Sequence, residues 1–441
     1  MSDPVKTSLL TLDARTKKRN AAETRFRMYG LAAIGAGLAM LVLLLVTIFG
    51  NGLGAFQQTF VTLNVPLLES KLDKKGERDL AKIKKVSTFG YAQLLSQAME
   101  DALAENGIDS DLKAKKQAAL LSKSAAADLR NFVISNTDKI GETVEFTFLA
   151  NSRVDGYLKN RVTRESIADD KSINAEQLDL VDELVAAGVI KKRFNISFIT
   201  GADASDQRPE AAGMGVAMMG SFFMMLVVLA LALPIGVAAS IYLEEFAPKN
   251  WITDIIEVNI SNLAAVPSIV FGILGLAVFI NYMHLPQSAP LVGGLVLTLM
   301  TLPTIIISTR ASLKSVPPSI RDAALGVGAS KMQSVFHHVL PLAAPGILTG
   351  TIIGLAQALG ETAPLLLIGM IGFIASNAPD SVASGLLDPN SAMPAQIYEW
   401  AKRADPAFYE RAWGGIIILL AFLITMNTIA VLLRRRFERR W

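Results

Sequence analysis

The sequence lacks the residues on which several kinds of chemistry depend. It contains no cysteine and only three histidines, two of which are adjacent (His337 and His338). Disulfides, thiolate metal sites and cysteine nucleophiles are therefore excluded, and little material remains for a metal centre. Aromatic residues make up 7% of the 441 positions and do not alternate with basic ones, so nucleic-acid binding has no support. We expect the chain to bind no metal and no cofactor.

Charge is also scarce, because 18% of the residues are charged against roughly 25% in soluble domains. The charges are missing from long continuous stretches, between Arg27 and Glu69, between Glu210 and Glu244, and between Glu257 and Arg310. A helix needs about 20 apolar residues to cross the hydrocarbon core of a membrane. The sequence therefore predicts an all-α polytopic membrane protein.

Six transmembrane helices account for the apolar stretches. The run after Glu257 is too long for one helix, and the turn-forming segment 281–290 divides it into two. The predicted spans are 29–50, 213–243, 259–280, 290–309, 346–374 and 413–433. The corresponding domains are an N-terminal tail (1–28), the first transmembrane helix (29–50), a domain between the first two spans (51–211), a core of five spans (212–434) and a basic tail (435–441).

The distribution of lysine and arginine predicts the orientation of these spans. Basic residues gather before the first span, between the fourth and fifth spans, and after the last span. The short loops on the other side carry only Lys402, Arg403 and Arg411. Because positive residues favour the cytoplasmic side, both termini are expected in the cytoplasm, and segment 51–211 outside it.

Segment 51–211 has the character of ordinary soluble sequence, with charges of both signs. Residues 91–132 place apolar side chains at helical spacing, whereas 144–149 and 194–200 alternate like strands. We therefore expect a small α+β extracytoplasmic domain. The segment shows no metal cluster, nucleophile constellation or phosphate loop.

The stretch between the fourth and fifth spans predicts two short helices. Ser319 and Asp322 have the spacing of a capping box, and Gly328 can stop the helix that they start in a left-handed conformation. Ser330 and Gln333 form a second start of the same kind, and Leu340-Pro341 is expected to end the second helix. Small side chains before Gly328 leave room for another protein to approach the backbone.

The triplet Asp322-Ala323-Ala324, with Gly328 and Leu340-Pro341, resembles the EAA loop of ABC importer permeases. In that family a glycine follows the acid by six residues and Leu-Pro starts twelve residues later, as it does here. The resemblance implies a type I ABC importer permease in which the coupling loop, residues 310–345, docks on an ATPase subunit. Asp322 departs from the usual glutamate, and His338 from a commoner aliphatic residue. An ordinary helical hairpin is the alternative.

One acid lies within the predicted fifth span. An acid at the bilayer centre costs roughly 2.5–3.5 kcal/mol, so Glu361 should face the bundle interior or a polar cavity. Gly360 and Pro364 would loosen the helix there and free backbone groups to line that cavity. Glu361, Thr362 and Gln357 are therefore candidates for the translocation path. The alternative for Glu361 is a structural acid paired with a neighbouring helix.

Four segments, 243–249, 262–272, 301–304 and 360–365, resemble the PstA family of phosphate permeases, and the likeness covers 212–441. Segment 51–211 looks like the extra domain of long-form members. Many members carry arginine at the position of Gln357, so this chain departs from their pattern there. Arg310, at the inner end of the fourth span, is a candidate partner for phosphate. Its alternative role is that of a positive anchor on the cytoplasmic side.

The resemblance also implies partners. They are a second, PstC-like permease, a pair of PstB-like ATPases and a periplasmic PstS-like phosphate-binding protein, besides membrane lipid. The chain has no G-x-x-x-x-G-K-[ST] motif, so a separate subunit must hydrolyse ATP and this chain is not expected to be an enzyme. Three alternatives stay open: a permease for another oxyanion such as molybdate, sulfate or a phosphonate, a membrane-anchored phosphate sensor, and an intramembrane enzyme. No paired carboxylates or Ser–His pair support the last.

Overall fold

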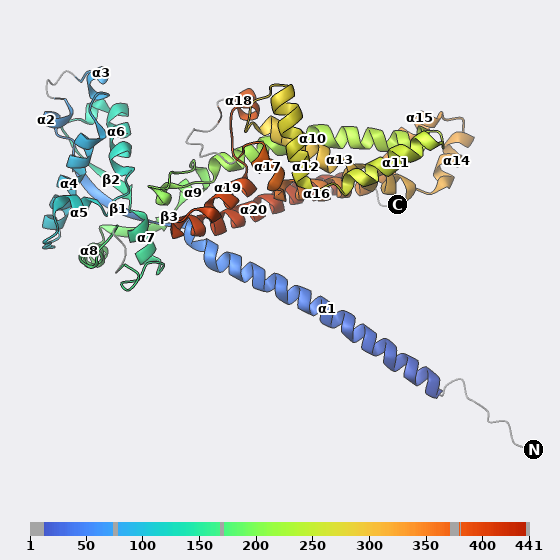
Figure 1. The fold of residues 1–441 in the computed structure, drawn as a ribbon, viewed down its shortest axis with the longest axis horizontal. Coiled ribbons are helices and arrows are strands. Elements are labelled where there is room, and N and C mark those ends of the chain that lie inside the picture. Colours follow the sequence, from blue (N-terminus) through green and yellow to red (C-terminus); the bar gives the residue numbers. More distant parts are fainter. Residues whose placement is uncertain (1–12, 74–77, 168–171, 371–378, 380, 438–441) are drawn as a thin grey trace, which may run out of the picture. The chain divides into compact units, whose positions relative to one another are not determined.

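The computed structural model describes residues 13–73, 78–167, 172–370, 379 and 381–437, and the chain divides into two compact units, Met1–Asn51 and Gly52–Trp441. Figure 1 gives the order of the elements. Parts of three predicted segments lie outside the described residues: the N-terminal tail before 13, the fifth span after 370 and the basic tail after 437.

The first unit is formed by one long helix, α1 (Ala14–Gly52), whose final residue begins the second unit. The helix has 39 residues and contains the predicted span 29–50. Most of the basic stretch predicted as a tail is helical too, because its alanine, arginine and lysine residues favour helix. The helix thus begins about four turns before the apolar stretch.

The second unit starts with an α+β domain built on a small antiparallel sheet. The strands are β1 (Gln57–Pro66), β2 (Thr143–Leu149) and β3 (Ile190–Phe194), in the order β2-β1-β3. Phe60 of β1 lies opposite Leu149 of β2, and Gln57 lies opposite Phe194 of β3. The central strand is therefore the first of the three in the chain.

Helices cover this sheet and close its core. The longer ones are α4 (Thr88–Glu105), α6 (Ala125–Ser135) and α8 (Ala175–Ala186). The shorter helices are α2 (Glu69–Leu72), α3 (Leu80–Ile83), α5 (Ala114–Ala118), α7 (Ser152–Leu158), α9 (Ile196–Thr200), η1 (Leu53–Phe56), η2 (Thr137–Lys139) and η3 (Pro209–Ala211). Val61, Leu63 and Val65 of β1 pack with Tyr91 and Leu94 of α4 in one buried cluster. The predicted α+β fold is confirmed.

Two details of the strand prediction are wrong. The stretch predicted as a strand at 194–200 is helical after Phe194, because the Asn195 side chain accepts the backbone N–H of Phe198 and starts α9. The sequence prediction also missed β1, the central strand. Its signal was present, because Val61, Leu63 and Val65 alternate with less buried residues.

Five helices of the described chain are long and apolar enough to cross a membrane. They are α1, α10 (Gly215–Ile241), α13 (Pro290–Lys314), α16 (Leu340–Gly360) and α20 (Pro406–Phe437). A bent pair of shorter helices makes a sixth if it counts as one span. Further short helices are α17 (Ala363–Leu367), α18 (Val382–Leu387) and α19 (Met393–Lys402).

The third predicted span, 259–280, is not one continuous helix. It consists of α11 (Trp251–Ala264) followed by α12 (Ser268–Leu274) and the π-helical segment η5 (Gly275–Tyr282), and the two halves are bent by 103°. Pro267 lies at the break and has no N–H to donate to the preceding turn, which explains why α11 ends just before it.

The fifth predicted span, 346–374, is also interrupted. Helix α16 ends at Gly360, and Glu361 follows in an extended conformation with φ −73° and ψ 134°. The loosening expected from Gly360 and Pro364 is what the structure shows, and it goes as far as a complete break in the helix at Glu361. Proline at 364 is tolerated because it lies in the first turn of the short helix α17.

Small residues let α16 pack closely against α13. A Cβ added to Gly350 would lie 2.0 Å from Ser308 Oγ, and one added to Gly346 would lie 2.4 Å from Ser312 Oγ. Small residues at such spacing let transmembrane helices approach each other closely. Glycine on α16 and serine on α13 therefore let the two helices lie close together.

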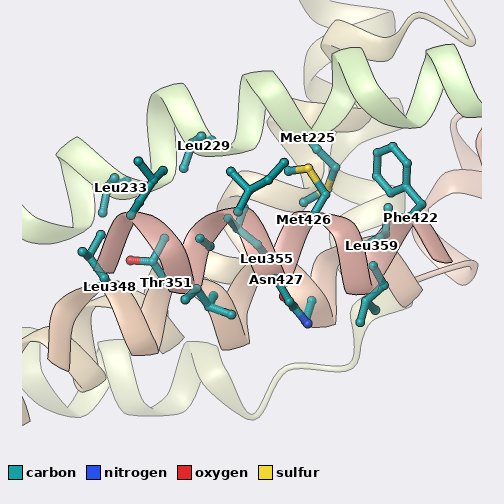
Figure 2. A pocket seen from close by; sticks show the side chains of 16 residues that line it. Met225, Leu229, Leu233, Leu348, Thr351, Leu355, Leu359, Phe422, Met426 and Asn427 are labelled. Atoms are coloured by element: carbon teal, nitrogen blue, oxygen red, sulfur yellow. The ribbon is translucent and has the colours of Figure 1, made fainter. Parts of the chain in front are cut away.

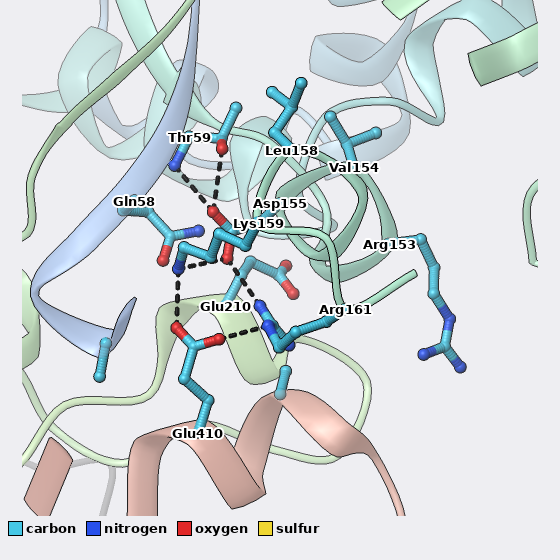
Figure 3. A network of polar contacts seen from close by, with 12 residues as sticks. Gln58, Thr59, Arg153, Val154, Asp155, Leu158, Lys159, Arg161, Glu210 and Glu410 are labelled. Atoms are coloured by element: carbon cyan, nitrogen blue, oxygen red, sulfur yellow. Dashed lines mark hydrogen bonds and ion pairs between the residues drawn. The ribbon is translucent and has the colours of Figure 1, made fainter. Parts of the chain in front are cut away.

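A buried ion-pair network joins the α+β domain to the start of α20 (Figure 3). Asp155 of α7 accepts hydrogen bonds from the N–H and hydroxyl of Thr59 in β1, at 3.0 and 2.9 Å. Lys159 Nζ lies 2.7 Å from Asp155 and 2.8 Å from Glu410 of α20, and Arg161 pairs with the same two acids. Asp155 and Glu410 are 2% and 6% exposed. We call these four charged residues the interlock.

Neighbouring polar groups extend the interlock. Arg411 Nη2 donates 2.9 Å to the backbone oxygen of Glu210, and its Nη1 donates 3.2 Å to that of Ala55. Burial raises the pKa of the Glu210 carboxyl, which accepts a hydrogen bond from the Ser122 hydroxyl. The α+β domain is therefore held to α20 by polar and charged groups that are buried together.

Glu410→Gln is expected to destabilise the protein by about 3–5 kcal/mol, because it leaves Lys159 and Arg161, whose side chains are 7% and 22% exposed, with half of their compensating charge. Thermal unfolding of the purified full-length chain in detergent measures the effect. The matched control is Glu399→Gln, which removes a more exposed pair with Lys402 and should cost less than about 1 kcal/mol. Equal losses in the two variants would contradict a structural role for the interlock.

Candidate functional site

The loop between α13 and α16 starts with a helix that begins earlier than predicted. Helix α14 (Pro318–Gly326) follows Pro317, and Pro318 occupies its first position, where a preset φ and a missing N–H are both acceptable. Ser319 therefore lies inside the helix, and its predicted capping box with Asp322 does not form. Asp322 and Ala323 are exposed, whereas Ala324 is buried.

Gly328 stops α14 as predicted. Its φ is +88°, its N–H donates 3.0 Å to Leu325 O, and the next N–H, of Ala329, donates 3.0 Å to Ala324 O. This pair of hydrogen bonds is the Schellman arrangement, which needs a left-handed residue at the helix end. The turn leaves Val327 86% exposed, the most exposed large hydrophobic residue among those described.

The second predicted helix start is also confirmed. Ser330 Oγ accepts the N–H of Gln333 at 3.2 Å, and Gln333 Oε1 accepts the N–H of Ser330 at 2.9 Å, which is a complete capping box. Helix α15 (Lys331–Ser334) and the π-helical segment η6 (Val335–Val339) follow.

The second helix does not end at Leu340-Pro341, so this prediction is wrong. The segment η6 runs directly into α16, and Pro341 lies in the first turn of α16. The wider hydrogen-bond register of the π-helical turn lets the chain continue past a residue without an N–H.

Arg321 clamps this loop to the ends of two membrane helices. Its guanidinium makes a bidentate pair with Glu245, at 2.6 Å from Nη2 and 3.1 Å from Nε. It also donates to the carbonyl oxygens of Leu313, at 2.9 Å, and Val316, at 2.8 Å. Glu245 belongs to η4 (Tyr242–Phe246), the π-helical extension of α10. Helix α14 is thus tied to α13 and α10 at once.

Arg310 makes a second clamp. Its Nε lies 3.3 Å from Glu244 of η4, and its Nη2 lies 2.6 Å from Glu257 of α11. The side chain is 16% exposed. Two carboxylates already face this guanidinium, which favours the structural alternative over a role as phosphate partner. The sequence prediction missed all three acids, although they stand in the charged stretch between the second and third spans.

An apolar surface surrounds the Schellman turn. Leu325, Val327, Met332 and Phe336 are each more than two-fifths exposed; Val327 follows α14 directly, and the other three belong to α14, α15 and η6. Because exposed apolar patches rimmed by polar residues mark interaction sites, this surface is fitted to receive another protein. We call it the knuckle. The predicted coupling residues Asp322 and Ala323 are exposed on the same helix as Leu325, α14.

The two interrupted helices meet inside the bundle. A Cβ added to Gly272 of α12 would lie 2.7 Å from Pro364 Cα of α17, so the two short helices touch backbone to backbone. Both follow a break, at 265–267 and at 361–362. Broken helices at membrane depth are tolerated where they are buried in protein or line a cavity, and in transporters they build substrate sites.

Glu361, Thr362 and Gln357 stand at this break. Glu361 and Thr362 are half-buried, and Gln357, four residues earlier on α16, is exposed. Within the described part of the chain, no hydrogen bond or ion pair reaches the Glu361 carboxylate. The alternative of a structural acid with a fixed partner is thus not supported there, and the three residues stay candidates for the translocation path.

Arg321→Ala and Glu245→Ala should each destabilise the folded protein by about 2 kcal/mol, because a bidentate, partly buried pair is lost. The double variant should cost little more than either single one, since the residues contact each other. Thermal unfolding of the four proteins gives the coupling. Lys314→Ala is the control, because Lys314 is 60% exposed and 3.6 Å from Glu244. Additive losses would show that the clamp is not an interacting pair.

Comparison with known proteins gives family matches for both the N-terminal and the C-terminal part of the chain. A family model described as "binding-protein-dependent transport system inner membrane component" matches residues 232–441, and one described as a domain of unknown function (DUF3333) matches residues 13–168. The first match includes the knuckle and both interrupted spans, and it begins within α10. The second includes most of the α+β domain.

Individual relatives agree with the first model. The PstA phosphate transport permease of Mycobacterium leprae is 30% identical over 231 residues, which is 52% of this chain and 73% of that protein. The PstA of Yersinia pestis is 29% identical over 224 residues, 50% of this chain and 73% of that protein. The probable ABC transporter permease YqgI of Bacillus subtilis is 35% identical over 159 residues, and the match spans about half of it, 53%.

A solved structure, the inward-facing methionine ABC transporter MetNI, matches with 15% identity and a TM-score of 0.38, covering 51% of this chain and 98% of that one. The sequence relatives are closer, and they carry the assignment. The chain is a multi-pass inner-membrane protein that belongs to the binding-protein-dependent transport system inner membrane components, in the branch of the PstA permeases.

Proposed function

We propose that the chain is a permease subunit of an ATP-driven importer that moves inorganic phosphate across the bacterial inner membrane. The knuckle carries this proposal. It is an exposed apolar surface at the end of a membrane bundle, and the clamps of Arg321 and Arg310 tie it to α10, α11 and α13. Relatives named as phosphate permeases match the same part of the chain.

The knuckle suits docking to an ATPase subunit. Its Schellman turn fixes Val327 and its neighbours in one conformation, so little chain entropy is lost when a partner binds. Movement of the partner would be passed through α14 to the ends of α13 and α10, because Arg321 holds all three together. On this proposal the ATPases, a PstB-like pair, bind and hydrolyse the ATP.

The interrupted helices suit the substrate path. Freed backbone groups at the breaks 265–267 and 361–362, with Glu361 and Thr362, would line the route that opens alternately to each side. A PstC-like second permease would complete the route, and a PstS-like binding protein would deliver phosphate from outside. Both termini would then face the cytoplasm, where the knuckle meets the ATPases, and the α+β domain would lie outside.

Cells that depend on this permease should take up radiolabelled phosphate, and unlabelled phosphate should compete at least about tenfold better than sulfate or molybdate. A discrimination of this size corresponds to about 1.4 kcal/mol of differential binding. If another oxyanion competed more strongly, the assignment as a permease would stand, but that oxyanion would be the substrate in place of phosphate. Normal phosphate uptake in cells that lack the chain and all its paralogues would contradict the proposal.

Val327→Asp should reduce copurification of the ATPase subunit and phosphate uptake by at least about tenfold, because a charge would be buried at the centre of the docking surface. The fold should be unchanged, since the side chain is 86% exposed. Val382→Asp, at a valine that is 68% exposed on α18, is the matched control and should leave ATPase copurification intact. If the Val327→Asp variant copurified normally with the ATPase subunit, the knuckle would not be part of the ATPase interface.

A further inference from the structure

A narrow apolar groove runs between α10, α16 and α20 (Figure 2). Its volume is about 240 Å³, and leucine, isoleucine, methionine, alanine and phenylalanine side chains form most of its wall. Met225, Leu229 and Leu233 of α10 line one side, opposite side chains of α16 and α20. All three helices are long and apolar enough to span the membrane, so the groove lies at the depth of the lipid chains.

The groove is long and thin. It extends from Leu359 to Leu348 along α16 and from Phe422 to Leu433 along α20. Eleven residues of helix rise by about 16 Å. Apolar side chains of three helices line this stretch, which suits an extended hydrocarbon chain.

A half-buried cation stands at one end of the groove. Arg434 follows the lining residue Leu433, and its Nη1 donates 3.0 Å to Thr349 Oγ1 of α16. Its Nε is buried and has no hydrogen-bond partner among the described residues. A buried donor without an acceptor is costly, and guanidinium groups prefer phosphate and carboxylate oxygens. The next residue, Arg435, is exposed.

None of the residues that line the groove is basic, and Arg434 adjoins the groove at the end formed by Leu433. The apolar slot and the cation are therefore arranged in one direction, like the chain and the headgroup of a lipid. An acyl chain gains about 0.8 kcal/mol for each CH₂ group that it buries, and an anionic headgroup gives Arg434 its missing acceptor.

We propose that this groove binds one acyl chain of an anionic phospholipid, with the lipid phosphate hydrogen-bonded to Arg434. The bound lipid holds α16 and α20 at a fixed spacing along the stretch that lines the groove. Helix α16 ends at Gly360, just before Glu361, and the interlock residue Glu410 lies near the start of α20. Transport by the permease then depends on the lipid composition of the membrane, independently of which oxyanion is carried.

The test uses the full-length chain in lipid nanodiscs and phosphatidylglycerol with a photoactivatable diazirine in one acyl chain. Wild type should be labelled on groove peptides, such as the one that contains Met426. Arg434→Ala should reduce this labelling about tenfold, because a charge-assisted hydrogen bond is lost. Arg435→Ala, the matched control at the neighbouring exposed arginine, should reduce it less than about twofold.

Leu355→Trp, which fills the groove, gives a second readout that leaves Arg434 in place. It should abolish labelling of the groove peptides while thermal unfolding shows that the chain is folded. Equal labelling by phosphatidylcholine, or undiminished labelling of Arg434→Ala, would overturn the proposal. So would a photo-crosslinker at position 426 that reacts with another protein subunit rather than with lipid, because the groove would then belong to a protein interface.

Discussion

The bidentate pair between Arg321 and Glu245 is the contact on which a force-transmitting role of this protein depends. A surface loop passes movement to a membrane bundle only if it is fixed to several helices at once. Arg321 meets this condition, because its guanidinium binds a carboxylate after α10 and two carbonyl oxygens at the end of α13. Arg310 adds α11 through Glu257. Without these contacts the knuckle would be an apolar patch on a mobile hairpin.

Ion pairs with little exposure to solvent also hold the structure together at the other end of the bundle. The interlock fixes the α+β domain to α20 with ion pairs that include residues exposed by only a few per cent. Between these two held ends lie the breaks in the third and fifth spans, where Gly272 and Pro364 bring α12 and α17 into backbone contact. The breaks interrupt the regular helices of two spans, whereas α13 and α16 pack glycine against serine.

Local rules predicted the local structure of the loop. The left-handed Gly328 and the capping box of Ser330 and Gln333 depend on residues within four positions, and both are confirmed. The clamps were not predictable in this way, because Arg310 and Arg321 reach acids 66 and 76 residues away. Pro267 was a local signal for the break in the third span. The span was predicted from hydropathy, however, and hydropathy does not register the effect of a single proline on a helix. The interlock depends on how the α+β domain packs against α20. The spacing of apolar residues in the sequence gives no information on that packing.

The most direct test of this account uses the absence of cysteine from the natural sequence, since an introduced cysteine is then the only thiol in the chain. Val327→Cys and Val382→Cys place that thiol on the knuckle and on α18. The account predicts that position 327 crosslinks to the ATPase subunit and reacts with a membrane-impermeant maleimide only from the cytoplasmic side, while position 382 reacts only from outside. Labelling of position 327 from outside would contradict it.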